Sequence, residues 1–133
     1  MASGATSFSA NMGPGTRGTY AFLPENMNSV WQRACGGDLN AMFDLGMYFW
    51  EMGATSEAYR WFQSGGDMWT NKSNHNCMLM LAYMHLTGCG AYYDGEIAQN
   101  YYKCALEKEE AFDARCTDTH AVLKEAKAKA DRE

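Results

Sequence analysis

Five cysteines are the residues of this 133-residue chain with the most versatile chemistry, because thiolates bind metals and form disulfides. Cys77 and Cys89 have the same spacing as Cys104 and Cys116. A helical hairpin would pair Cys77 with Cys116 and Cys89 with Cys104, although twelve residues turn a helix by about 120° and place the two cysteines of one helix on different faces. The repeat described below would instead bring Cys77 near Cys104. These two pairings conflict, and the odd number of cysteines, Cys35 included, leaves at least one thiol unpaired in any disulfide scheme. We therefore expect small buried thiols, with a thiol-redox module as an alternative.

Two pairs of histidine and cysteine have the spacing that zinc ligands use. His85 precedes Cys89 by four residues, and Cys116 precedes His120 by four, so each pair would lie one helical turn apart. No close Cys-x2-Cys pair accompanies them, and Cys89 lies in a glycine-rich stretch. We therefore expect no metal site, and a metal-binding helical module is kept as an alternative.

The remaining polar residues do not form a catalytic pattern. The carboxylates are scattered and mostly fit helix capping or a solvated surface. No order of Ser, His and Asp and no pair of acids is typical of an active site, so we expect no enzyme activity, no cofactor and no small-molecule substrate. The formal net charge of −5 provides no basic field for nucleic acid.

Capping residues and glycines divide the chain from residue 24 to 108 into five expected helices. They are predicted at 25–35, 39–52, 56–64 and 74–86, with a fifth that follows Asp94 or Gly95 and runs to about residue 108. Asp38 and Ser56 are the expected N-caps of the second and third helices. No segment alternates as a strand does, and both prolines lie outside the proposed helices. The sequence therefore predicts an all-α fold.

The two ends of the chain differ from this helical domain in composition. Residues 1–23 are rich in Gly and Ser and are expected to form an extended tail that lies along a partner protein. Residues 109–133 are highly charged and are expected to form a capping helix from about residue 118. Val122, Ala126 and Ala130 would make the apolar stripe of that helix.

Two stretches of the helical domain repeat one pattern of small and large residues. Leu45 and Leu81 are 36 residues apart, whereas Ala58 and Ala98 are 40 apart because the second turn is longer. Small residues let two helices approach closely, and aromatic residues fill the space between helix pairs. The expected repeat-core residues are Ala41, Leu45, Gly46, Phe49, Ala58, Phe62, Leu81, Ala82, Ala98 and Tyr102.

This pattern resembles the Sel1-like repeat, a branch of the tetratricopeptide superfamily. The family's unit reads Ala-x3-Leu-Gly, then Tyr, Gly-x-Gly and Asp-x3-Ala-x2-Trp-Tyr-x2-Ala. The second unit here has Ala82 in place of the Gly and His85 in place of the Tyr, and the first unit lacks the Gly-x-Gly turn. The resemblance covers about residues 27–107. It implies a short right-handed α-solenoid of antiparallel helix pairs that serves as an adaptor or scaffold.

The helical domain also has the composition of an interface. Residues 25–106 hold eight acids and four bases and are rich in Met, Tyr, Trp and Asn, and interfaces favour aromatic residues and Met over Lys and Glu. We expect a structural or accessory subunit of a larger multiprotein complex that binds other protein subunits, with a transient signalling adaptor as an alternative. Turns of repeat arrays face outward. The candidate contact residues are Trp31, Trp50, Tyr59, Trp69, Tyr92 and Tyr93.

An intracellular setting is expected, with the mitochondrion favoured over the cytoplasm. The first 24 residues lack acids, contain Arg17 and are rich in Ser, Thr and Ala, a composition that resembles an organellar transit peptide. The equal cysteine spacing resembles that of the twin-cysteine hairpins of the mitochondrial intermembrane space. The longest apolar run, residues 77–86, is shorter than the roughly 20 residues that span a bilayer, so no transmembrane segment is expected.

Overall fold

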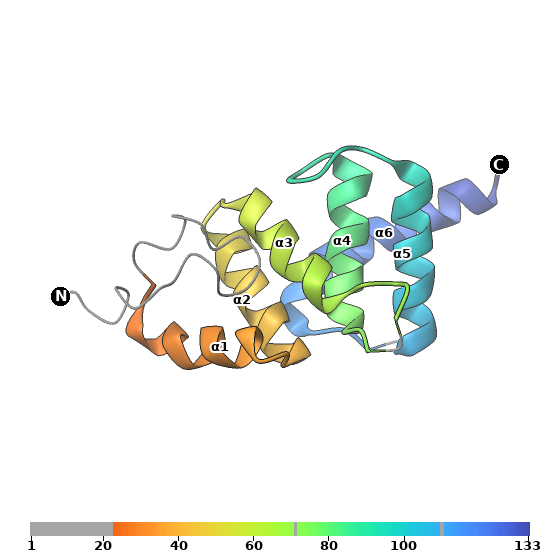
Figure 1. The fold of residues 1–133 in the computed structure, drawn as a ribbon. Coiled ribbons are helices and arrows are strands. Elements are labelled where there is room, and N and C mark those ends of the chain that lie inside the picture. Colours follow the sequence, from red (N-terminus) through yellow and green to blue (C-terminus); the bar gives the residue numbers. More distant parts are fainter. Residues whose placement is uncertain (1–22, 71, 110) are drawn as a thin grey trace.

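A computed structural model describes residues 23–70, 72–109 and 111–133, which form helices joined by loops (Figure 1). No strand occurs within these ranges, so the predicted all-α class is confirmed. Of the expected tail, only Leu23 is described, and it is buried; residues 1–22 lie outside the described part of the chain. The helices are α1 (Glu25–Cys35), α2 (Leu39–Glu51), α3 (Thr55–Gly65), α4 (His75–Thr87), α5 (Gly95–Lys108), a short 3-10 helix (Ala114–Cys116) and α6 (Thr117–Asp131).

Short polar side chains fix the beginnings of three helices. Asp38, Asn74 and Asp94 each accept hydrogen bonds from backbone N–H groups two or three residues further along the chain, as N-cap residues do. The predicted cap at Ser56 is wrong, because α3 already begins at Thr55 and no side chain caps it. Ser56 therefore lies inside the first turn of that helix.

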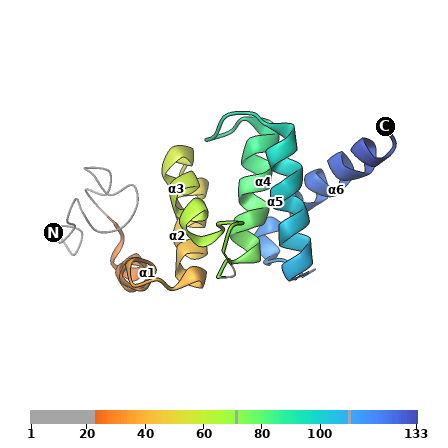
Figure 2. The ribbon, with the colours of Figure 1, turned by 45° about the vertical axis from the view of Figure 1, so that its right-hand side comes forward.

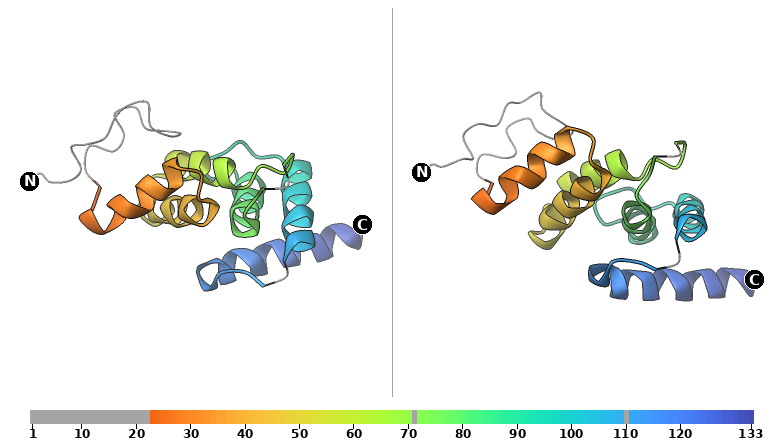
Figure 3. Two further views of the ribbon diagram at one scale, coloured as in Figure 1. Left: turned by 60° about the horizontal axis from the view of Figure 1, so that its bottom comes forward. Right: turned by 90° about the horizontal axis from the view of Figure 1, so that it is seen from below.

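The helices stack in chain order. α2 lies beside α3 and α4 lies beside α5, while α1 packs against α2 and α3 packs against α4. Figure 2 separates these neighbours, with α1 at one end of the molecule. Figure 3 shows α6 running across α4 and α5, with its C-terminal end reaching beyond them. No described helix is both long enough and apolar enough to span a membrane.

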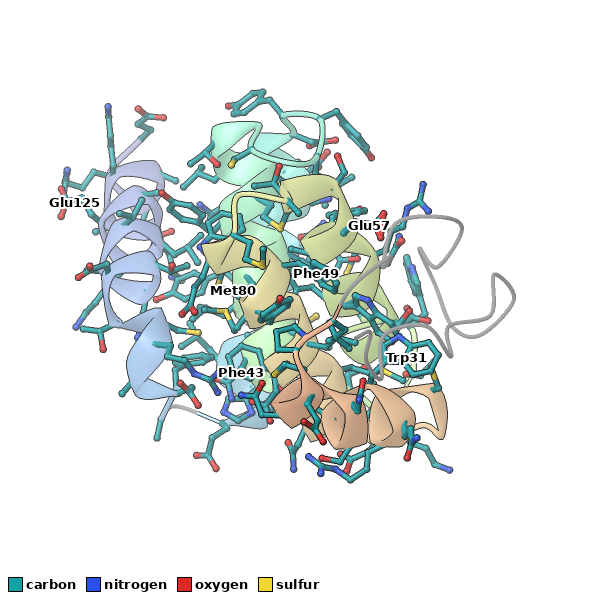
Figure 4. All side chains as sticks on the ribbon, turned by 90° about the vertical axis from the view of Figure 1, so that its left-hand side faces the viewer. Trp31, Phe43, Phe49, Glu57, Met80 and Glu125 are labelled. Atoms are coloured by element: carbon teal, nitrogen blue, oxygen red, sulfur yellow. The ribbon has the colours of Figure 1, made fainter. Side chains whose placement is uncertain are left out.

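One apolar core runs through the whole stack. Phe43, Phe49 and Met80 lie between the helices in Figure 4, and all three are buried. Trp61, which stands at the Trp position of the Ala-x2-Trp-Tyr pattern, and Met84 are fully buried as well. All ten predicted repeat-core residues are buried in this core: Ala41, Leu45, Gly46, Phe49, Ala58, Phe62, Leu81, Ala82, Ala98 and Tyr102.

Gly46 marks a close approach of α2 to α3. A Cβ atom at this position would lie 2.5 Å from Cε1 and 2.7 Å from Cδ1 of Phe62, whereas carbon atoms pack best at about 3.5–4.0 Å. The Phe62 ring is fully buried and packs against Phe43 with the ring centroids 6.1 Å apart. The ring therefore has little room to move aside, and the spacing of these two helices depends on glycine.

The C-terminal segment is held against α4 by two hydrogen bonds and a buried side chain. Nε2 of His75 donates to the carbonyl of Ala111 at 2.8 Å, and the backbone N–H of Asp113 donates to Oδ1 of Asn76 at 2.8 Å. Leu123 is the fully buried residue of α6.

The apolar stripe predicted for α6 is rotated from its actual buried face. Of the expected stripe residues, Val122 is 43% exposed, Ala126 is half-buried and Ala130 is exposed, whereas Thr119 and Leu123 are buried. Neighbouring residues are about 100° apart around a helix, so the contacts with α4 select a face that alanine-rich periodicity alone does not identify.

Candidate functional site

The loop between α3 and α4 presents a tryptophan to solvent. Trp69 is 85% exposed, and its backbone N–H donates to Oδ1 of Asp67 at 2.9 Å. Oγ of Ser73 donates to the Asp67 carbonyl, and the N–H of Asn74 closes the loop on the Gly65 carbonyl at 2.6 Å. Because these bonds fix the backbone, little entropy is lost there when a partner covers the indole.

A groove of about 330 Å³ separates this loop from the outer face of α5. Met68 and Trp69 form its loop side, and Lys103 and Glu107 place opposite charges on its α5 side. Ordered aromatic side chains beside apolar and mixed-charge surface are typical of the residues that dominate protein interfaces. Asn100 and Cys104 complete the lining.

The loop between α4 and α5 presents two tyrosines. Tyr92 is 66% exposed and Tyr93 is 68% exposed. Nδ1–H of His85 donates to the Tyr92 carbonyl at 2.9 Å, and the N–H of Asp94 donates to the His85 carbonyl at 2.9 Å. Gly90 lets this loop lie against α3, since its φ of 79° belongs to the left-handed region and a Cβ would meet Thr55 at 2.9 Å.

His85 joins α3, α4 and this loop. Its Nδ1 must carry the proton to donate to the Tyr92 carbonyl, so in the neutral ring Nε2 accepts from the Tyr59 hydroxyl, 3.1 Å away. The ring stacks on Tyr101 with an interplanar angle of 6°. Because both ring nitrogens form hydrogen bonds, neither is available to bind zinc together with Cys89.

The other predicted contact residues are less accessible. Trp31 is only 3% exposed and packs in the core, so its assignment as a partner contact is corrected to a core residue. Trp50 is half-buried and packs edge-on against Tyr83, with the ring centroids 6.0 Å apart. Tyr59 is half-buried and is oriented by His85. The sequence analysis missed Met52, which is 65% exposed in the turn between α2 and α3.

None of the five cysteines, all of which lie in the described ranges, forms a disulfide. Burial, with the neighbouring Cys116 and Asp44 as smaller contributions, raises the pKa of Cys77 well above its usual value. Burial also raises the pKa of Cys116 to about 12. Cys77 and Cys116 both belong to the apolar core, and no disulfide joins them. Within the described ranges, no group of three or more His, Cys, Asp or Glu residues is arranged to hold a metal ion.

No protein-family model matches the chain, and no curated protein or solved structure matches it.

Proposed function

We propose that this protein is a non-catalytic scaffold that docks other proteins through its two aromatic loops. The observation that carries the proposal is the exposure of Trp69, Tyr92 and Tyr93, at 66–85%, on loops whose backbones are fixed by hydrogen bonds. Such side chains offer large contact areas at low entropic cost. A short Sel1-like α-solenoid of antiparallel helix pairs would present both loops on a rigid frame.

One partner can span both loops. α4 joins them and has thirteen residues, which correspond to about 20 Å at 1.5 Å per residue. A standard interface covers about 800 Å² on each partner, a patch roughly 30 Å across. We propose an accessory subunit of a larger assembly as the setting, with the mitochondrion as its compartment.

The test replaces Trp69, Tyr92 and Tyr93 with serine and follows the native mass of the chain in gently lysed cells. A control variant carries Met52→Ser and Val122→Ser, which remove exposed apolar side chains outside the two loops. We expect the wild type and the control to migrate in a high-mass species and the triple variant to be lost from it. A monomeric wild type would refute the stable-subunit proposal.

Thermal melts followed by circular dichroism separate lost docking from lost folding. Exposed side chains contribute little to the core, so the triple variant should melt within a few degrees of the wild type. A collapse of the melting transition would show that these residues belong to the core and that the docking assignment is wrong.

A further inference from the structure

A second groove, of about 380 Å³, lies between α1 and α2. Met27 and Val30 are three residues apart on α1, so they share one face of that helix. Asp44, Tyr48 and Glu51 share a face of α2 for the same reason. The groove therefore has an apolar middle with ionisable groups at its ends. Its lining residues are Met27, Val30, Asp44, Tyr48, Glu51 and Arg115.

The groove belongs to the acidic half of the molecule. Residues 23–70 contain six acids and two bases, whereas the other described residues contain nine acids and eight bases. Most of the net charge of −5 therefore lies on residues 23–70, and two of their acids, Asp44 and Glu51, line the groove itself. The electrostatic potential of this half favours a basic partner and disfavours an acidic one.

The two ends of the groove differ in how their charges are compensated. At one end, Nη2 of Arg115 lies 2.9 Å from Oδ1 of Asp44, and the same guanidinium bonds Asp113. Arg115 also lies over the Phe43 ring, 4.9 Å from its centroid. At the other end, Glu51 is exposed, and none of the salt bridges among the described residues involves it. Glu51 is thus the carboxylate available to a basic ligand.

The dimensions of the groove suit an extended peptide. Asp44 and Glu51 are seven residues apart on α2, about 10 Å along the helix axis. An extended chain covers that distance in about three residues. Tyr48 and Glu51 are three residues apart on α2, which places their Cβ atoms about 5–6 Å apart, and alternate residues of an extended chain share a face and lie about 7 Å apart. A segment that rests an apolar side chain on Met27, Val30 and Tyr48 therefore brings the residue two positions away to Glu51.

We propose that this groove binds an extended segment of another protein that carries Lys or Arg two positions from an apolar residue. The inference rests on the proposed scaffold function and adds a peptide contact distinct from the aromatic loops. The apolar residue is desolvated between α1 and α2, and the basic residue forms a charge-assisted hydrogen bond with Glu51.

A library of displayed random dodecapeptides, panned against the full-length chain, tests the proposal. We expect enriched peptides to share a basic residue two positions from an apolar one. Binding of a synthetic consensus peptide should weaken about tenfold in the Glu51→Lys variant, the equivalent of one charged contact. The matched control is Glu125→Lys, the same charge change on the exposed surface of α6, on the other side of the molecule from Trp31 (Figure 4). This control should leave binding within about twofold.

A charge exchange completes the test. A consensus peptide whose basic residue is replaced by Glu should bind the Glu51→Lys variant better than it binds the wild type. Peptides that lack a basic residue, or whose binding is unaffected by Glu51→Lys, would overturn the groove proposal. Peptides that instead depend on Trp69, Tyr92 and Tyr93 would also overturn it while supporting the aromatic-loop function. A failure to enrich any peptide would overturn the groove proposal alone, since the native-mass experiment tests the loops separately.

Discussion

Replacing Gly46 with alanine should destabilise this protein, although alanine is the better helix former. Helix propensity alone predicts a gain of about 0.5–1 kcal/mol. The added Cβ, however, would lie 2.5 Å from Cε1 of the fully buried Phe62, so the ring or one helix must move by about 1 Å to reach normal contact. Overpacking of this kind costs about 1–3 kcal/mol. The expected net effect is a loss of about 1–2 kcal/mol, in which the packing cost exceeds the propensity gain.

Urea unfolding followed by circular dichroism measures this loss, and the slope with denaturant should stay unchanged. A thermal melt should shift down by about 3–8 °C. The matched control is Ala82→Gly, the reverse exchange in the second unit. It should also destabilise by about 1–2 kcal/mol, because it removes a buried methyl group and adds backbone freedom. The two losses together would show that the first unit requires glycine at position 46 and the second requires alanine at position 82.

A double mutant identifies the clash itself. In a Phe62→Leu background the smaller side chain leaves room for the new methyl group, so Gly46→Ala should cost at least about 1 kcal/mol less than in the wild type. A rise in the unfolding midpoint of the single Gly46→Ala variant would refute the reasoning. It would show that α2 and α3 lie further apart and that this glycine is not needed for their packing.

Three further predictions concern titratable or hydrogen-bonding side chains that are buried or half-buried. Tyr59→Phe removes the hydroxyl that His85 Nε2 accepts from, so the urea-unfolding free energy should fall by about 1–2 kcal/mol; an unchanged value would contradict the described bond. Because burial raises the pKa of both Cys77 and Cys116, a thiol reagent near pH 8 (about the ordinary thiol pKa) should leave both unlabelled in the native protein and label them after denaturation, as read by peptide mass spectrometry. Rapid native labelling of either would show that it is accessible. Burial, assisted by Lys124, lowers the pKa of His120 below 6.5, so the unfolded chain binds this proton more readily and stability should fall as the pH drops below 6.5. Urea titrations across this range should show a smaller fall for His120→Gln, and an equal fall would exclude His120 as a source.

The sequence determined those features that depend on residues close together in the chain. Asp38 and Asp94 mark helix starts because an N-cap bonds backbone groups two or three residues away. Glycine pairs and turns separate the helices for a similarly local reason. The spacing of Leu45 and Leu81 identified core positions, since small and large residues must recur wherever helix pairs pack.

Tertiary structure alone decided which aromatic residues face solvent. Trp31 and Trp69 are both bulky and apolar, yet one is buried and the other is 85% exposed. Their exposure depends on which distant helices cover them. The role of His85 likewise arises from Tyr59, 26 residues away in the chain. A helix's buried face, a hydrogen-bond partner and a groove between α1 and α2 all depend on contacts between distant segments, and local propensities do not encode where those segments meet.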